Sequence, residues 1–182
     1  MKKVIFVLGV LCLLVLPGLV LAQAGNIVCY GDTQGLVCDL DNSGGFMIVY
    51  VLHMNSPGAT AVQFALMVEG AALTWVADLS AHDVIGNSRD GVGIAFGGCV
   101  ASPNLVIQAT YTGTSNPCDI IKVVPDPILN EPRDVLVTDC TVPIPVLQNT
   151  TGYASYINDN GSCSCGYPVE ETTWGKVKSL YR

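Results

Sequence analysis

Phe46-Met-Ile-Val-Tyr-Val-Leu-His-Met54 is an uninterrupted run of apolar, β-branched and aromatic residues. Turn-forming residues border it on both sides, with Asp41-Asn-Ser-Gly-Gly45 before it and Asn55-Ser-Pro-Gly58 after it. A run of this length between turn signals is typical of a strand, and it is shorter than most helices. Residues 46–54 therefore predict a buried strand.

Similar runs recur along the chain, at 62–68, 73–77, 92–96, 105–111, 120–124 and 135–139. Glycine, asparagine and proline separate them, and no apolar stripe of helical period is sustained before Thr172. Seven or eight short strands with such spacing predict an all-β fold, a single antiparallel β-sandwich of the immunoglobulin or cohesin type. The expected core lies between two sheets, around Phe46, Phe64, Trp75 and Phe96.

Length and charge narrow the range of functions. The 182 residues suffice for one domain with a substantial core. The chain has fifteen acidic and eight basic residues, which gives a net charge of −7. Because no basic stripe is available to neutralise phosphates, we expect no binding of nucleic acid.

The N-terminal segment has the form of a secretory signal. Lys2 and Lys3 precede an apolar run over 4–16, and a small-x-small pattern allows cleavage after Ala22 or Ala24. A membrane anchor over 4–22 is the alternative, since that run almost spans a bilayer. We predict a helical signal peptide at 1–24, a sandwich domain at 25–167, and a linker with a short tail at 168–182. The mature protein would be secreted, to the periplasm or the cell surface, and would not span the membrane.

The cysteines also indicate an oxidising compartment. Cleavage would leave seven: Cys29, Cys38, Cys99, Cys118, Cys140, Cys163 and Cys165. In an exported chain these predict disulfides, at most three, with one cysteine left over or joined to another chain. Cys29 and Cys38 are candidates for a local pair. Cys163 and Cys165 lie too close to bridge each other comfortably, so we expect different partners for them.

The C-terminal segment is short, amphipathic and cationic. A helix there would place Trp174, Val177, Leu180 and Tyr181 on one face. The basic residues of this tail are Lys176, Lys178 and Arg182. About ten residues with an internal glycine cannot hold a helix alone in water, so the tail predicts a docking element that lies against a partner or against its own domain.

The ending Thr173-Trp-Gly-Lys-Val-Lys-Ser-Leu-Tyr-Arg182 resembles the terminus of uncharacterised secreted bacterial proteins with an all-β body. Two internal stretches, 55–64 and 86–94, are similar to theirs as well. The resemblance implies export and a single sandwich domain, and no activity is assigned to those proteins.

Two groups of residues are candidate sites, and each also has an ordinary structural interpretation. Asp39, Asp41 and Ser43 match the first half of a calcium loop, but the position that needs a bidentate glutamate is Tyr50, inside a predicted strand. Asp83 and Asp90, near His82, could be the carboxylates of a hydrolase, although no nucleophile motif accompanies them and we expect Asp83 in a loop.

The sequence therefore predicts a non-enzymatic binding or surface-assembly module without a required cofactor. Its partner would be a protein or a cell-surface component, and oligomers could form through the odd cysteine or the tail. A secreted hydrolase and a calcium-dependent adhesin are the alternatives.

Overall fold

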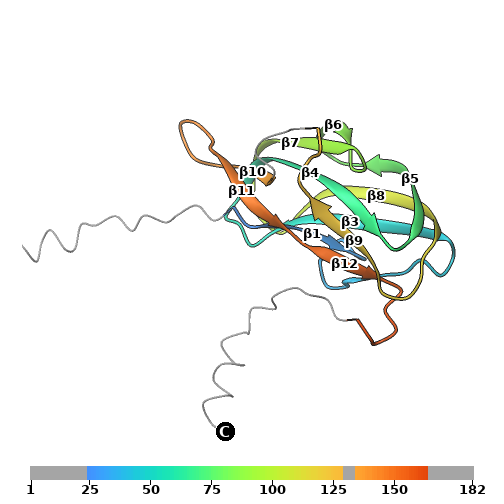
Figure 1. The fold of residues 1–182 in the computed structure, drawn as a ribbon. Coiled ribbons are helices and arrows are strands. Elements are labelled where there is room, and N and C mark those ends of the chain that lie inside the picture. The colour runs from blue at the N-terminus through green and yellow to red at the C-terminus, as the bar shows by residue number, and fades with distance from the viewer. Residues whose placement is uncertain (1–23, 129–133, 164–182) are drawn as a thin grey trace, which may run out of the picture.

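The computed structural model describes residues 24–128 and 134–163, which form an all-β body (Figure 1). Apart from Ala24, the predicted signal segment lies outside the described residues, and so does the predicted tail at 168–182. Within the described ranges, no helix has the length and apolarity required to traverse a membrane. The strands are β1 (Asn26–Tyr30), β2 (Asp39–Leu40), β3 (Phe46–Met54), β4 (Ala59–Glu69), β5 (Ala72–Leu79), β6 (Asp83–Asn87), β7 (Gly91–Val100), β8 (Asn104–Thr114), β9 (Asp119–Val124), β10 (Val135–Asp139), β11 (Leu147–Gly152) and β12 (Ala154–Ile157).

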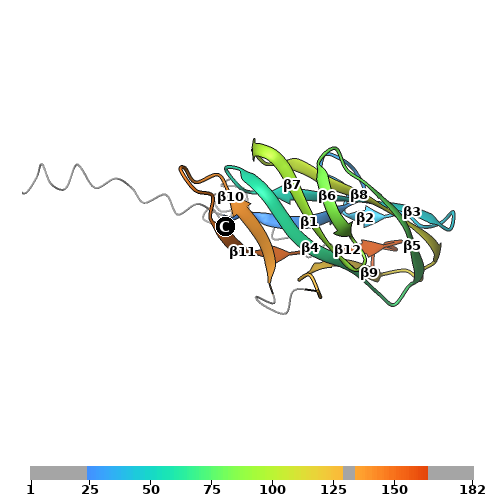
Figure 2. The same cartoon turned by 90° about the horizontal axis from the view of Figure 1, so that it is seen from above.

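The strands form two facing layers (Figures 1 and 2). One layer has the order β1-β3-β8-β5. In the other layer β4 is central, with β7 and then β6 on one side. On its other side β4 pairs with β10 along Ala59–Gln63 and with β9 along Ala65–Glu69. β11 joins the layers at one edge, because it pairs antiparallel with β10 and parallel with β1.

The core fills the space between the layers. In β3, Met47, Val49 and Val51 point inward and are almost completely buried. Phe64 in β4 is fully buried in the same core, as predicted. The prediction for Phe46 is wrong: its side chain is 52% exposed, because strand alternation places it on the face opposite to Met47.

Disulfides brace the ends of the strands. Cys99 and Cys140 join the end of β7 to the residue after β10, and Cys118 joins the start of β9 to Cys163. Cys38 is disulfide-bonded as well. The predicted use of cysteines as disulfides is therefore confirmed, while Cys165 lies outside the described residues.

The predicted local pair of Cys29 and Cys38 is wrong. Cys29 lies in β1 on the side of Ile27, fully buried in the main core, and this burial raises the pKa of its thiol. Cys38 packs against Val28 and Tyr30, on the opposite face of β1. A side chain that points from β1 into the core and one that packs against the other face of β1 cannot be bridged, however short the intervening loop.

All seven predicted runs form strands, and five of these strands are longer than predicted. The expectation of a loop at Asp83 is wrong, because Asp83–Asn87 forms β6 and pairs along β7. β6 has only two β-branched residues, Val84 and Ile85, and polar or turn-forming residues surround them, so its strand conformation depends on the ladder that β7 offers.

Candidate functional site

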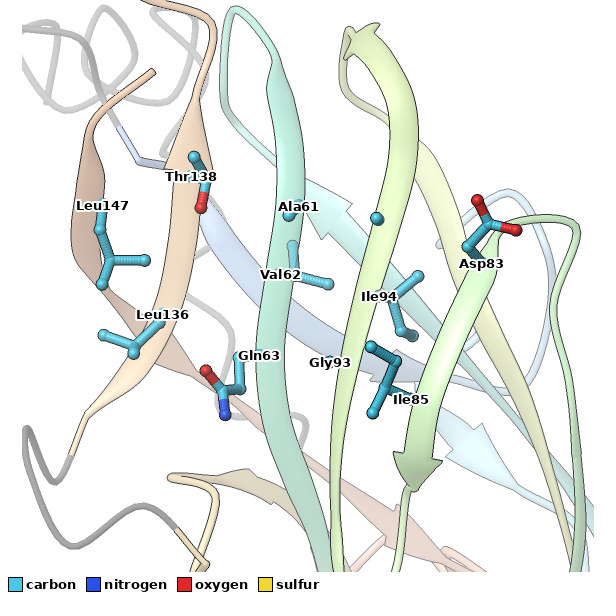
Figure 3. A pocket seen from close by; sticks show the side chains of 11 residues that line it. Ala61, Val62, Gln63, Asp83, Ile85, Gly93, Ile94, Leu136, Thr138 and Leu147 are labelled. Atoms are coloured by element: carbon cyan, nitrogen blue, oxygen red, sulfur yellow. The ribbon is translucent and has the colours of Figure 1, made fainter. Parts of the chain in front are cut away.

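The pairing register places two rows of outward side chains across the face formed by β6, β7, β4, β10 and β11. Cross-strand partners share a face of a sheet, and Ala61 of β4 is opposite Ala95 of β7 and Thr138 of β10. The first row contains Leu147, Thr138, Ala61, Ala95 and Asp83, and the second contains Leu136, Gln63, Gly93 and Ile85. These residues, together with Val62 and Ile94, line a cavity of about 250 Å³ (Figure 3), which we call the groove.

The groove has a low centre and higher ends. Its middle strands contribute small residues, and a Cβ added at Gly93 would meet no atom within 4 Å. At opposite ends stand Ile85, which is 82% exposed, and Leu147, which is 57% exposed. The amide of Gln63 is held aside, because its Nε2 donates to Asp126 Oδ2 at 2.8 Å. The result is an open, mostly aliphatic trough with room for side chains of another molecule.

The loop between β10 and β11 continues this apolar surface beyond the groove. Its residues 140–146, which we call the tip, include no charged side chain. Val142 is 87% exposed and Ile144 is 73% exposed. Figure 1 shows the loop between β10 and β11 projecting from the body. The groove residue Leu147 begins β11 and follows the tip directly in the chain.

The base of the tip is fixed by Asp139. Its carboxylate accepts hydrogen bonds from the backbone N–H of Val146 (2.8 Å) and of Thr141 (3.0 Å), and from Gln148 Nε2 (2.6 Å). These donors, Val146 first, hold the pKa of Asp139 below its usual range. The adjacent Cys140 is bridged to Cys99. An apolar loop held in one conformation loses little entropy on contact, which favours binding.

The described part of the chain is strongly acidic. It contains twelve aspartates and glutamates but only two bases, Arg89 and Lys122. Both bases are used in ion pairs, Arg89 with Asp90 at 2.6 Å and Lys122 with Glu69 at 2.5 Å. Three acids lie at or near the groove. Asp83 lines it, and Asp126 accepts the hydrogen bond from Gln63. Asp134 accepts a hydrogen bond from Asn149, the residue opposite Leu136 in the ladder. A partner would therefore meet an aliphatic floor with negative charge around it.

The residues of the predicted calcium loop have structural partners. Asp41 Oδ1 accepts from the N–H of Ser43 at 2.8 Å, and this bond lowers the pKa of Asp41. Asp39 Oδ1 accepts from the N–H of Asp159 at 2.8 Å. One cluster of metal-type ligands occurs in the described ranges, Cys118 with Asp159 and Cys163, but its two sulfurs form a disulfide. The calcium interpretation stays a prediction.

The carboxylates of the alternative hydrolase lie apart. Asp83 begins β6 on the groove face, whereas Asp90 lies in the turn beyond the other end of β6, bonded to Asn87 and Arg89. Asn87 is four positions along the strand from Asp83, which corresponds to about 13 Å, more than the roughly 5–10 Å that paired glycosidase carboxylates require. The ring of His82 contacts Phe96, with centroids 4.7 Å apart. These residues do not form a common site.

Sequence reasoning missed the groove and the tip. The groove residues Ala61, Gly93 and Ala95 are small and ordinary in sequence, and only the register unites them. A usable signal existed for the tip, since Val142-Pro-Ile-Pro-Val146 is apolar without strand alternation between turn-forming residues.

No family model matches the chain, and no curated protein matches it. Among solved structures, a cohesin module from a Clostridium perfringens family 33 glycoside hydrolase aligns with a TM-score of 0.51 and 10% identity, over 74% of this chain and 97% of that one. A cohesin of Acetivibrio cellulolyticus scaffoldin B, solved with a dockerin, gives 0.46 at 12% identity, over 74% and 97%. A ScaB type I cohesin of Pseudobacteroides cellulosolvens gives 0.45 at 10% identity, over 78% and 97%. At such identity the first likeness shows the fold alone: the described body is an all-β, cohesin-like module.

Proposed function

We propose that this chain is an exported, disulfide-braced, non-enzymatic module that binds another protein through the groove and the tip. One observation carries the proposal: apolar surface extends from Ile85 across the groove to Leu147 and on to Ile144. Exposed apolar side chains that gather on one face of a domain are a feature of interaction sites. The cohesin-like fold of the body is compatible with a binding role.

The partner has a definite chemistry in this proposal. An aliphatic trough with a small-residue floor accepts aliphatic or aromatic side chains, which supply most of the binding energy at protein interfaces. The two bases of the described residues pair with Asp90 and Glu69, so they do not neutralise the acids around the groove. Those acids favour a partner with lysine or arginine beside its apolar residues. The partner is therefore a protein segment with apolar residues flanked by basic ones.

Export is part of the same proposal, with the signal segment within residues 1–24 and the sandwich at 25–167 as the binding domain. The two bridges Cys99–Cys140 and Cys118–Cys163 support it, because disulfides persist in oxidising compartments such as the periplasm and the cell exterior.

Filling the groove provides the test. Gly93→Leu adds a side chain where a Cβ meets no neighbour, so the fold is retained while the trough is occupied. Gly98→Leu is the matched control, since Gly98 lies on the same strand, is equally unobstructed and does not line the groove.

The partner would first be isolated from the exported proteins of the source cells, purified, and titrated by calorimetry with wild type and both variants. We expect Gly93→Leu to raise the dissociation constant at least about tenfold, as blocking a hot spot does, and Gly98→Leu to leave it unchanged. Equal affinities for all three proteins would refute the groove as the site, and the lack of any saturable protein partner would refute the function.

A further inference from the structure

We infer that the C-terminal segment of this same chain, Trp174–Arg182, occupies the groove when no other partner does. The inference rests on the proposed function, because it gives the groove its first occupant. It is drawn from three properties: the charge of the described body, the composition of the segment, and the length of chain that connects the two.

The charges of the two parts are complementary. The described residues carry twelve acids and two bases, and both bases are already in ion pairs. Residues 174–182 carry three bases and no acid. Asp83 in the groove and Asp134 beside it are acceptors of the kind that such bases need. A second copy of the body would instead bring like charge to the same face, which disfavours face-to-face pairing of two bodies.

The apolar content of the segment suits the trough. Trp174, Val177, Leu180 and Tyr181 are large side chains that a ten-residue segment cannot bury by itself. The floor at Ala61, Gly93 and Ala95 is low and offers them apolar contact. Tryptophan and tyrosine are also the residues that contribute most per side chain at protein interfaces.

The connecting chain is long enough. Residues 164–173 lie between the bridged Cys163 and Trp174. Ten extended residues span up to about 34 Å, which is comparable to the diameter of a small domain. The β4–β9 register places Cys118, the bridge partner of Cys163, about eight residues of strand, or about 26 Å, from the level of Gln63. An extended linker can therefore span the distance to the groove of its own body.

Trp174 reports on this docking in the full chain. The protein has two tryptophans, and Trp75→Phe leaves Trp174 as the single emitter. We expect blue-shifted emission and slow acrylamide quenching in Trp75→Phe and in Trp75→Phe/Gly98→Leu, but exposed, rapidly quenched tryptophan in Trp75→Phe/Gly93→Leu. Reversing Lys176 and Lys178 to glutamate weakens docking by about two- to fivefold per charge, the range for exposed ion pairs.

A second readout avoids any change at Trp75. The methyl resonances of Ile85 and Leu147, at the two ends of the groove, should shift between wild type and Lys176→Glu/Lys178→Glu, while the methyls of Val76, outside the groove, stay constant. Docking within one molecule is independent of dilution, so quenching that changes over about a hundredfold dilution would overturn the intramolecular assignment and indicate a second copy.

Equal quenching with the groove open and filled, together with unshifted Ile85 and Leu147 methyls, would overturn the inference. If Gly93→Leu nevertheless weakened the binding of an external partner, the proposed function would stand without this inference. If Gly93→Leu changed neither the docking of the segment nor the binding of the partner, the inference and the proposed function would both fail.

Discussion

Removing the bridge between Cys99 and Cys140 should cost this protein a large part of its stability. The bridge closes a loop with a sequence separation of 41 residues. In the chain-entropy description, a crosslink over that length restricts the unfolded chain by an amount equivalent to about 4 kcal/mol at 25 °C. The whole free energy of unfolding of such a domain is about 5–15 kcal/mol. The double variant Cys99→Ala/Cys140→Ala should therefore still fold, with a free energy of unfolding lower by about 4 kcal/mol.

The second bridge provides a matched comparison. Cys118 and Cys163 are 45 residues apart, so the same relation gives a loss for Cys118→Ala/Cys163→Ala that differs by only about 0.1 kcal/mol. Urea unfolding of the oxidised proteins, followed by circular dichroism, measures both losses against wild type. Losses below about 1 kcal/mol, or losses that differ by more than about 2 kcal/mol, would refute loop closure as the main origin of the stabilisation.

The remaining predictions concern the core, the tip and the N-terminus. Phe64→Ala should lower the free energy of unfolding by about 3–5 kcal/mol, measured in urea, because a fully buried ring leaves a cavity; a loss below about 1 kcal/mol would contradict its place in the core. Burial lowers the pKa of His53, so below about pH 6.5 the unfolded chain takes up a proton that the folded chain does not. Stability should thus fall as the pH drops from 7 to 5, and His53→Gln should flatten that slope; an unchanged slope would exclude His53 as its source. Asp139→Asn should accelerate amide exchange at Thr141 and Val146 without affecting strands distant from the tip; unchanged exchange would show that the carboxylate does not hold the loop. N-terminal sequencing of the exported protein should give Gln23, because cleavage after Ala24 would remove the carbonyl that bonds buried His53 Nε2 at 2.8 Å; a Gly25 terminus would contradict this.

Features that depend on neighbours in the chain could be predicted from the sequence. Phe46–Met54 is a strand as its composition predicts, because β-branched and aromatic side chains suit a pleated, half-buried surface whatever strand lies beside it. The all-β class followed in the same way, from several such runs between turns. The general use of cysteines as crosslinks followed from their number in a chain with a signal-like start.

Features that depend on which strand lies beside which could not be predicted. Cys29 and Cys38 are close in sequence, yet they occupy opposite faces of β1. Asp83 lies in a strand because β7 supplies a ladder for it. The groove combines residues from five strands that lie between positions 61 and 147.

The sequence by itself thus determined the secondary-structure class and the acidic character of the body, since both properties are local or additive along the chain. The tertiary structure alone decided the disulfide partners, the groove and its Gly93 floor, and the fixed base of the tip at Asp139. The physical reason is that a strand's period of two leaves the facing residue undetermined until the register is set, and a shift of one residue would turn every groove side chain into the core.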